Sequence, residues 1–377
     1  MKPVRVLHIT EELSAAGIES FIMNIYRRID KSKVQFDFLV LRNQNEFYDD
    51  EIKSLGGVKY TISPKSSNIL CRVYEESYLV ERFLKNNHYD IVHVHYTTPL
   101  RAPLLKGIKN ANVNTRIYHS HSAYVLGKSR LKLFIYSYMS KKITKHATHY
   151  FACSNAAGEW IFEEKIVKEG KVKVIYNGID TNRFAYDPQK RSNIRKELGV
   201  TSEFLIIHTG RFTEQKNQHF IVEVFAEFLS MNPQSRLLLL GKGELEDSVR
   251  KQIQQLGVED KVFMLGVKSN VEDYLSAADL YIMPSLYEGL PVAAVEAQCS
   301  GLPCILSSNI TKEVKLTDAV EFLSLESSKS QWCDAIKSKM YKTRSDCSLS
   351  VKKQGYDVQE VSNRLQDFYE KRGEKND

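Results

Sequence analysis

Two polar clusters in the second half of the chain have the residue types and spacing that hold a phosphate group. The first cluster, residues 284–296, reads PSLYEGLPVAAVE and directly follows an apolar run. Pro291 suits the first turn of a helix, whose start would leave backbone N–H groups unpaired from about Gly289 onward, at the positive end of the helix dipole. Glu288 and Glu296 flank this predicted anion site, and a carboxylate there can accept hydrogen bonds from hydroxyls beside the phosphate. The alternative is a capped helix with Glu296 exposed to solvent.

The second cluster, residues 210–217, reads GRFTEQKN and follows the apolar run 204–209. Gly210 permits a tight turn, Arg211 offers a planar fork of donors, and Lys216 offers a point charge, so both cations suit a diphosphate. A solvated basic loop is the alternative. The position of residues 210–217 at the carboxyl end of a predicted strand favours a binding role, because ligands of open parallel sheets bind there.

Two glycine turns are weaker signals for a phosphate site. Gly17 opens a predicted helix after the first strand, and Gly241 and Gly243 enclose a lysine. Neither turn completes the G-x-G-x-x-G pattern of a dinucleotide site. The chain also lacks an Asp-x-Asp pair, which could supply hard oxygen ligands for a divalent ion beside the diphosphate. We therefore expect no metal and no other cofactor, with basic side chains and helix N-termini neutralising the phosphates.

Histidines occur in two pairs at the ends of predicted strands, His93 with His95 and His119 with His121. Strand alternation places the two members of each pair on the same side. Imidazoles suit zinc, but the surrounding segment supplies no acidic residue to complete a ligand set. We expect His121 to line a polar cleft. A metal site and buried structural histidines are the alternatives.

Short apolar runs alternate with longer amphipathic segments along the whole chain, which predicts parallel βαβ units in two domains. Each domain is expected to be a Rossmann-like, doubly wound parallel sheet of the α/β class, and the two sheets are expected to face each other across a cleft. Asn177-Gly178 marks the boundary, so we predict domains at 1–180 and 181–355, followed by a helix in 356–377. The predicted strands are 4–9, 36–41, 91–95, 115–119, 150–152 and 172–175 in the first domain, and 204–209, 236–240, 261–265, 280–283 and 303–306 in the second.

Charge is unevenly distributed over the 377 residues, whose formal net charge is +7. Residues 91–158 contain ten Lys or Arg and no acidic residue. Such a segment attracts phosphates, anionic lipid headgroups or nucleic acid. Within it, residues 130–142 mix apolar and basic side chains as a helix lying on a membrane surface would. An ordinary helix packed in the domain is the alternative.

Other features of the composition favour a cytoplasmic location, with peripheral contact at the inner face of the plasma membrane. No apolar run is long enough to span a bilayer, and no secretory signal precedes the first predicted strand. The six cysteines form no C-x-x-C pair, so we expect free thiols in a reducing compartment.

Taken together, these motifs resemble those of the family 4 glycosyltransferases, which are retaining enzymes of the GT-B fold. Glu288-Gly289-Leu290-Pro291 with Glu296 resembles the E-x7-E element of that family. Gly210-Arg211, followed by Gln215-Lys216-Asn217, resembles its donor-phosphate element. Asn177-Gly178-Ile179-Asp180 resembles its interdomain signature. The likeness covers most of the chain and is strongest over residues 204–305.

The resemblance implies a role for each matched position. Arg211 and Lys216 would grip the diphosphate of a nucleotide-sugar donor, most commonly a UDP-sugar. The remaining implied contacts are Glu288 with the transferred sugar, Glu296 with the ribose, the backbone of Gly289 and Leu290 with phosphate or sugar, Lys268 beside the nucleobase, His121 near the transferred sugar, and Gly17 near the phosphates and acceptor. The C-terminal helix would cross back onto the first domain.

Two departures from the family pattern bear on the acceptor and the subgroup. Ala16-Gly17 stands where Gly-Gly is common, and Ala16 adopts a positive φ only at a steric cost, which puts the shape of the acceptor-side loop in doubt. Residues 307–314 depart from the commoner glycine-containing form and resemble a branch that makes capsular or exopolysaccharide. The expected acceptor is therefore a saccharide or a lipid-linked saccharide.

Three other functions fit parts of this pattern. A nucleotide-sugar epimerase shares the two-domain architecture, and it would change the donor without any acceptor. A non-catalytic nucleotide-sugar-binding subunit would not need both the acidic and the basic sets. A nucleic-acid-binding module would need a recognisable reading motif, which the chain lacks.

Overall fold

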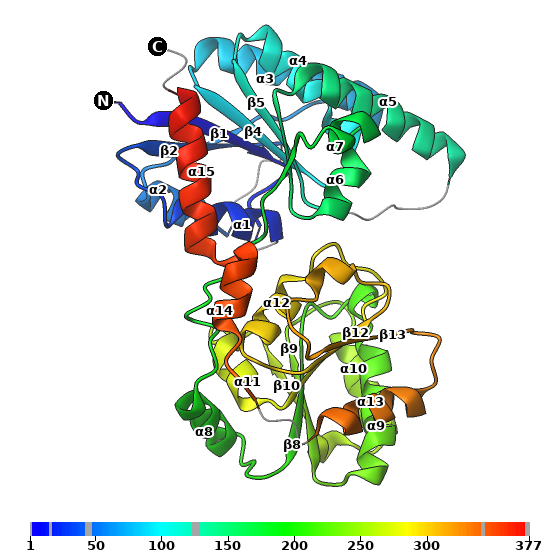
Figure 1. Cartoon of the computed structure of the whole chain (residues 1–377). Coiled ribbons are helices and arrows are strands. Elements are labelled where there is room, and N and C mark those ends of the chain that lie inside the picture. Colours follow the sequence, from blue (N-terminus) through cyan, green and yellow to red (C-terminus); the bar gives the residue numbers. More distant parts are fainter. Residues whose placement is uncertain (1, 15–16, 42–46, 123–128, 341–343, 374–377) are drawn as a thin grey trace. The chain divides into compact units, whose positions relative to one another are not determined.

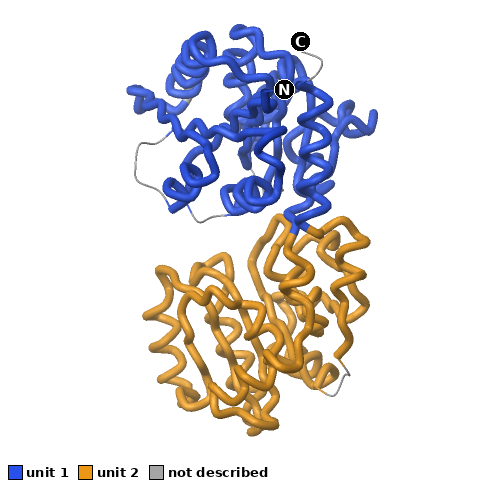
Figure 2. The backbone as a smooth tube through the Cα atoms, turned by 90° about the vertical axis from the view of Figure 1, so that its left-hand side faces the viewer, with its two compact units in different colours: residues 1–178, 358–377 blue, residues 179–357 orange. Residues whose placement is uncertain are grey.

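The computed structural model describes residues 2–14, 17–41, 47–122, 129–340 and 344–373. The chain divides into two compact units (Figure 2). Unit 1 comprises Met1–Gly178 together with Val358–Asp377, and unit 2 comprises Ile179–Asp357. The last helix therefore belongs to the same unit as the first strand.

Unit 1 is built on a parallel sheet in the order β3-β2-β1-β4-β5-β6-β7 (Figure 1). Helices α1, α2 and α15 cover one face of this sheet, and α3, α4 and α5 cover the other. Because both faces are covered, the central strands are buried almost throughout, which explains their near-continuous apolar sequences. The strands are β1 (Val4–Thr10), β2 (Val34–Val40), β3 (Lys59–Thr61), β4 (Ile91–Tyr96), β5 (Thr115–Ser120), β6 (His149–Ala152) and β7 (Val172–Val174).

The helices of unit 1 connect these parallel strands. They are α1 (Gly17–Tyr26), α2 (Asp49–Ser54), α3 (Ile69–Asn86), α4 (Pro103–Asn110), α5 (Arg130–His146), α6 (Asn155–Ile161), α7 (Glu164–Lys168) and α15 (Val358–Gly373). Helix α15 packs against α1 and against β1, β2 and β4. Tyr369 and Leu365 of α15 are buried in the same apolar cluster as Phe36 and Phe38 of β2.

Unit 2 contains a second parallel sheet, in the order β10-β9-β8-β11-β12-β13. Helices α9, α10 and α13 share one apolar cluster with the sheet, in which Trp332 is fully buried. The strands are β8 (Phe204–Thr209), β9 (Ser235–Leu240), β10 (Val262–Gly266), β11 (Leu280–Met283), β12 (Cys304–Ser307) and β13 (Val320–Leu323). The helices are α8 (Pro188–Glu197), α9 (Gln218–Met231), α10 (Glu246–Gln255), α11 (Val271–Ala277), α12 (Val292–Cys299), α13 (Lys329–Lys339) and α14 (Ser348–Val351).

The prediction of two Rossmann-like parallel sheets is confirmed, and the differences lie at the sheet edges and helix ends. The edge strands β3 and β13 were not predicted, because they are short and only partly buried and so lack a clear apolar run. Pro291 is the residue preceding α12 and not part of its first turn. In both sheets the strand order reverses beside the first strand, between β1 and β4 in unit 1 and between β8 and β11 in unit 2. Ligands of open α/β sheets bind at such switch points.

Candidate active site

The two predicted phosphate clusters meet at the switch point of unit 2. One cluster follows β8 and the other follows β11, and these two strands pair directly. The loops are also joined by three hydrogen bonds. Leu286 N donates to Gln215 O at 2.8 Å, Gln215 Nε2 donates to Tyr287 O at 3.0 Å, and Asn217 Nδ2 donates to Pro284 O at 3.2 Å. Residues about 70 positions apart in sequence therefore form one structure.

Lys216 and Glu288 form an ion pair at the centre of this structure. Lys216 Nζ lies 2.6 Å from Glu288 Oε1, and the two side chains are only 19% and 9% exposed. A Cβ added at Gly210 would lie 3.2 Å from His208 Nε2 and 3.4 Å from Lys216 Cδ, so a side chain there would press on His208 and only touch the lysine stem. A diphosphate bound here would share the ammonium with the carboxylate, and Glu288 would keep an oxygen to accept a hydrogen bond from a neighbouring hydroxyl.

Arg211 lies at the rim of the same loop. Its side chain is 76% exposed, and its Nε is 3.8 Å from Glu244 Oε2. The backbone beneath it is fixed, because Gln218 Nε2 donates to Arg211 O at 2.9 Å. The structure thus gives Lys216 a fixed position, whereas the guanidinium of Arg211 extends into solvent from an anchored loop.

The start of α12 lies immediately after Gly289 and Leu290. The N-cap residue, Pro291, makes no side-chain hydrogen bond to the first turn, which leaves that turn's N–H groups for solvent or an anion. A third loop, after β12, supports this one, since Asn309 Nδ2 donates to Leu286 O at 3.1 Å. The carboxyl ends of β8, β11 and β12 therefore shape the site together.

Glu296 lies in α12 and is only partly accessible. Burial raises the pKa of its carboxyl to about 7, and the guanidinium of Arg183 opposes that shift. Arg183 is itself held by a two-pronged ion pair with Glu272, at 2.8 and 2.9 Å. A carboxylate with this pKa is close to half-protonated at neutral pH, so its capacity to accept hydrogen bonds from hydroxyls depends on pH.

The turn at Gly241 has a steric role. Its φ is +134°, and a Cβ there would lie 2.0 Å from Gly210 O. Gly210 N donates to Leu240 O at 2.9 Å, and Gly241 N donates to Gly266 O at 2.8 Å. The glycines thus let the ends of β8, β9 and β10 approach closely. Lys268 follows β10, with its Nζ 5.5 Å from the centre of the Tyr274 ring.

Unit 1 has a cavity of about 350 Å³ at its own switch point, between the ends of β1 and β4. Ile18 and Glu19, which follow Gly17 at the start of α1, line this cavity. Arg101 also lines it and bridges the carboxylates of Glu11 and Glu76, each at 2.8 Å. Ala16, whose backbone was in doubt from the sequence, lies outside the described residues.

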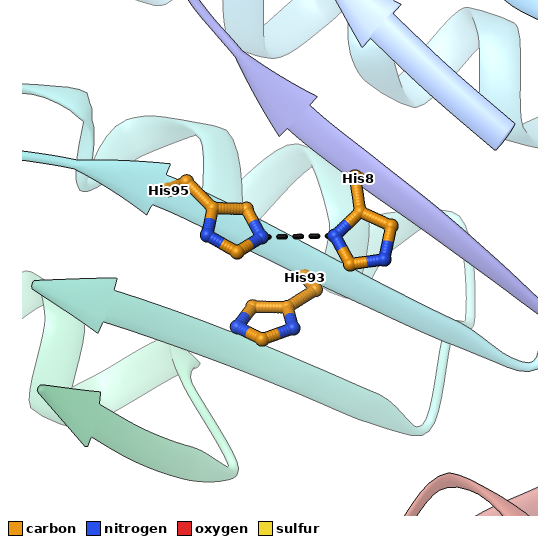
Figure 3. Close-up of side chains that lie close together, drawn as sticks. All are labelled: His8, His93 and His95. Carbon is orange, nitrogen blue, oxygen red and sulfur yellow. Dashed lines mark hydrogen bonds between the residues drawn. The ribbon is translucent and has the colours of Figure 1, made fainter. Parts of the chain in front are cut away.

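Beside this cavity, unit 1 contains a cluster of five histidines, namely His8, His93, His95, His119 and His121. Figure 3 shows three of them, with His8 Nδ1 bonded to His95 Nε2 at 2.9 Å. Burial lowers the pKa of every imidazole in the cluster, so all five are neutral at neutral pH. Among the described residues, two overlapping sets of three place a nitrogen from each ring within 4.8 Å of the others.

Several residues of these sites were not singled out from the sequence. His8 belongs to the cluster, but a single histidine in an apolar strand carries no distinguishing signal. Gln218 and Asn309 hold the loops of unit 2 through amide-to-carbonyl bonds, which no short motif reveals. Arg183 could have been suspected, because it follows the 177–180 signature closely.

Two parallel sheets with polar sites at their switch points define a doubly wound α/β protein with ligand sites beyond the carboxyl ends of its strands. Comparison with known families makes this specific. Residues 15–183 match the model described as Glycosyltransferase Family 4, and residues 190–338 match that described as Glycosyl transferases group 1. The chain is 36% identical over 339 residues to the putative glycosyltransferase EpsF of Bacillus subtilis, covering 88% of this chain and 86% of that one. The chain belongs to the family 4 glycosyltransferases.

Two further relatives agree with this assignment. The UDP-Gal:alpha-D-GlcNAc-diphosphoundecaprenol alpha-1,3-galactosyltransferase of Escherichia coli is 24% identical over 315 residues, with 81% of this chain and 79% of that one covered. The crystal structure of Anabaena Alr3699/HepE in complex with UDP and glucose superposes with a TM-score of 0.73 at 18% identity, over 97% of this chain and 99% of that one. The second likeness shows the fold, which is GT-B. The chain is thus a transferase that moves a glycosyl group.

Proposed function

We propose that this glycosyltransferase takes a hexosyl group from a UDP-sugar and transfers it, with retention of the anomeric configuration, to a saccharide or lipid-linked acceptor in surface polysaccharide synthesis. The observation that carries the donor assignment is the joining of the Lys216 and Glu288 loops at the switch point of unit 2. The names of the Escherichia coli and Anabaena proteins support a UDP-linked donor, and the former supports a diphosphoundecaprenol-linked acceptor.

In this proposal the bond between the anomeric carbon and the diphosphate oxygen breaks. Negative charge develops on the leaving oxygen, where Lys216, Arg211 and the first N–H groups of α12 stabilise it. The acceptor hydroxyl attacks from the face that the diphosphate leaves and gives its proton to the departing phosphate oxygen, so the configuration is retained. The remaining donor contacts proposed for unit 2 are Glu288 with sugar hydroxyls, Glu296 with the ribose, Lys268 beside the base, and Gly210, Gly289 and Leu290 along the diphosphate. In unit 1, we propose that Gly17 contacts the phosphates and that His121 contacts the sugar.

We propose that no metal ion takes part in this chemistry. The residues that converge on the proposed diphosphate site are a lysine, an arginine and a helix start, which already supply positive charge. The test is transfer activity measured after exhaustive treatment with EDTA. Activity that disappears with EDTA and returns with Mg²⁺ or Mn²⁺ contradicts this part of the proposal.

The donor assignment can be tested by thermal unfolding of the purified protein with a panel of nucleoside diphosphates and nucleotide sugars. A ligand that binds only the folded state raises the unfolding temperature. We expect a uridine ligand to give the largest shift and Lys216→Gln to abolish it. Lys329→Gln is the matched control, because Lys329 Nζ also lies 2.7 Å from a carboxylate in unit 2, that of Glu223.

Product analysis then separates transfer from epimerisation. The protein is incubated with the selected donor, first alone and then with lipid-linked saccharide acceptors, and the anomeric configuration of the product is read by NMR. Transfer to the acceptor with retention supports the proposal. A change in the sugar of the donor alone identifies an epimerase, and inversion contradicts the retaining mechanism.

We also propose that α5 and the adjoining part of α3 rest on an anionic membrane. Leu131 and Phe134 of α5 are 68% and 73% exposed, and Tyr78 of α3 is also exposed. Lys142 lies between the rings of Tyr74 and Tyr138, which ties the two helices into one basic and aromatic surface. Among the described residues, no helix is both long and apolar enough to cross a bilayer. The proposed contact is therefore peripheral, driven by apolar insertion and by attraction between lysines and lipid phosphates.

Flotation with vesicles tests this surface. We expect binding to phosphatidylglycerol-containing vesicles and weaker binding to phosphatidylcholine alone. Replacing both Leu131 and Phe134 by Ser should reduce binding, whereas replacing the exposed Met231 and Leu256 of unit 2 by Ser should not. Absence of binding to either kind of vesicle rejects the proposal.

A further inference from the structure

We propose that His8 and His95 are positioning residues, which form with His121 a row of three imidazoles that presents the outer nitrogen of His121, Nδ1, as a hydrogen-bond donor to an oxygen of a bound sugar. The contact with a sugar rests on the proposed function. The row itself is a property of unit 1 alone.

The row runs obliquely across three neighbouring parallel strands. His8 lies in β1, His95 in β4, and His121 directly after β5. His8 Nδ1 is 2.9 Å from His95 Nε2, and His95 Nδ1 is 2.9 Å from His121 Nε2. In the sheet, His8 pairs directly with His93, and His95 pairs directly with His119. Each hydrogen bond of the row therefore reaches the residue two positions beyond the directly paired one.

A second row lies against the first. Tyr369 of α15 bonds to His93 Nδ1 at 2.8 Å, and His93 Nε2 lies 3.2 Å from His119 Nδ1. Rings of the two rows stack with centroids 4.1 Å apart, both for His93 with His95 and for His119 with His121. The stacking fixes the planes of the rings, so a ring in the first row cannot turn without moving its neighbour in the second.

The walls around both rows are aromatic. Phe36 and Phe38 of β2 lie beside His8, Phe21 of α1 lies beside His95 and His121, and Phe151 of β6 lies beside His93. Burial lowers the pKa of His8 and His121 to about 3 and that of His95 well below its ordinary value, with no carboxylate acting in the opposite direction. Each ring is therefore neutral and has one donor nitrogen and one acceptor nitrogen.

Neutrality restricts the row to two arrangements. If His8 Nδ1 carries its proton, then His95 and His121 carry theirs on Nδ1 as well, and the donor ends at His121. If His121 carries its proton on Nε2, every bond reverses and an N–H is left at His8 Nε2. That nitrogen is buried and has no hydrogen-bond partner among the residues that the structure describes. The first arrangement instead leaves its N–H at His121 Nδ1, which is also buried without a protein partner among the described residues. His121 is partly exposed whereas His8 is 2% exposed, so the N–H of the first arrangement lies at the end of the row where a ligand can supply an acceptor, and this arrangement is favoured.

His121 Nδ1 is the other end of the row, and it also lacks a protein partner in the described part of the chain. This nitrogen is itself shielded, but the His121 residue is partly exposed where His8 is not, so this is the end of the row that lies nearer to the surface. As a donor this nitrogen suits a hydroxyl, ring or phosphate oxygen of a sugar ligand and disfavours an ammonium group. In this arrangement Nδ1 already carries the proton and Nε2 already accepts a hydrogen bond from His95. His121 therefore orients the ligand and does not act as a general base.

A metal ion is the rival occupant of the cluster. It would need three lone pairs directed at one point, whereas neighbouring rings here lie within 14–37° of parallel and use most of their nitrogens in bonds to each other or to Tyr369. No acidic residue contributes to the two candidate sets among the described residues.

The decisive measurement is the tautomer of each histidine in the full-length protein labelled with ¹⁵N-histidine, read from nitrogen shifts and two-bond N–H couplings without any substrate. We expect His8, His95 and His121 to carry their protons on Nδ1. Protons on Nε2 in all three rings overturn the proposal. Stoichiometric binding of Zn²⁺ that removes these signals also overturns it. None of these outcomes depends on transfer activity, so failure of the row and failure of the proposed function are separate results.

A matched pair of variants tests positioning. His95→Asn keeps an N–H near the place of Nδ1, whereas His95→Leu has nearly the same shape and no donor. We expect His95→Asn to preserve the Nδ1–H form of His121 and kcat/KM, and His95→Leu to let the ring exchange between tautomers and to lower kcat/KM about tenfold. His93→Leu, in the second row, should leave the tautomer of His121 unchanged. Identical behaviour of the Asn and Leu variants contradicts the assigned role of His95.

Discussion

Lys216 Nζ lies 2.6 Å from Glu288 Oε1, and this contact joins two loops that are 72 residues apart in the chain. The pair is largely shielded from water, so neither partner can be removed without leaving the other poorly compensated. In the proposed reaction the two groups have different duties, because the lysine meets the diphosphate and the glutamate meets the sugar.

Removing either partner should therefore damage catalysis. We expect Lys216→Gln and Glu288→Gln each to lower kcat/KM by about a hundredfold or more, equivalent to roughly 3 kcal/mol of transition-state stabilisation. The double variant should lose less than the sum of the two, since the residues are in contact. Steady-state transfer assays measure these values, with Lys329→Gln as the control. Full additivity would show that the pair does not act as a unit.

Arg211 should contribute differently, because its guanidinium is exposed and tied only loosely to Glu244. We expect Arg211→Ala to weaken donor binding and to lower kcat/KM about thirtyfold, equivalent to about 2 kcal/mol of transition-state stabilisation, without a change in the unfolding temperature. Calorimetric titration of a UDP-sugar and thermal unfolding give the two readings. Rates like those of the unmodified protein in this variant would remove Arg211 from the site.

The pKa of Glu296 predicts a pH-dependent affinity for the donor. Burial raises that pKa to about 7, so lowering the pH from 8 to 6 protonates the carboxyl and removes an acceptor for ribose hydroxyls. The affinity for an intact UDP-sugar should fall over this range, and in Glu296→Gln it should be weaker and nearly independent of pH. An intact sugar nucleotide is the right probe, because its diphosphate does not titrate near neutrality. Retention of the pH dependence in the variant would assign it to another group.

The sequence was informative where chemistry and backbone geometry coincide in one short motif. Glu288 and Lys216 lie after predicted strands, and the parallel-sheet rule places the ends of adjacent strands together, so their meeting at one site was predictable. The row through His8 was not, because it depends on the offset between β1, β4 and β5, which only the fold supplies. The edge strand β13 was missed for a related reason, since its partial burial leaves no apolar period.

We expect that only glycine is tolerated at position 241, because the backbone of the neighbouring loop packs directly against it. Its φ of +134° is unfavourable for other residues, and a Cβ would lie 2.0 Å from Gly210 O. We expect Gly241→Ala to lower the free energy of unfolding by more than about 3 kcal/mol and to weaken nucleotide binding, because the loop that carries Arg211 must move.

Gly257→Ala is the control for this prediction, since Gly257 has φ of +65° and open space around its Cβ position. Its cost should stay near 1–2 kcal/mol, the strain of a left-handed residue alone. Equal losses, measured by urea unfolding, would contradict the packing argument.

The buried histidines should make the protein sensitive to mild acid. Their folded-state pKa values lie below the ordinary value of 6.5, to about 3 for His8 and His121. Below pH 6.5 the unfolded chain therefore binds more protons than the folded one, so stability is greatest above that pH and falls as the pH drops toward 3. Each ring contributes a slope on the order of 1.4 kcal/mol per pH unit within this window. Glu296 acts in the opposite sense between about pH 4.5 and 7, and Glu76, whose pKa burial also raises, acts in that sense above pH 4.5, but these two carboxyls oppose the five histidines of the cluster.

Urea unfolding between pH 7.5 and 5 measures this slope. Replacing His119, which is fully buried in the second row, by Leu should reduce the slope by the contribution of about one proton. The loss of the bond to His93 lowers stability at every pH, so the slope and not the absolute value is the diagnostic quantity. A slope that is unchanged in the His119 variant would mean that this ring is already protonated, or solvated, in the folded protein.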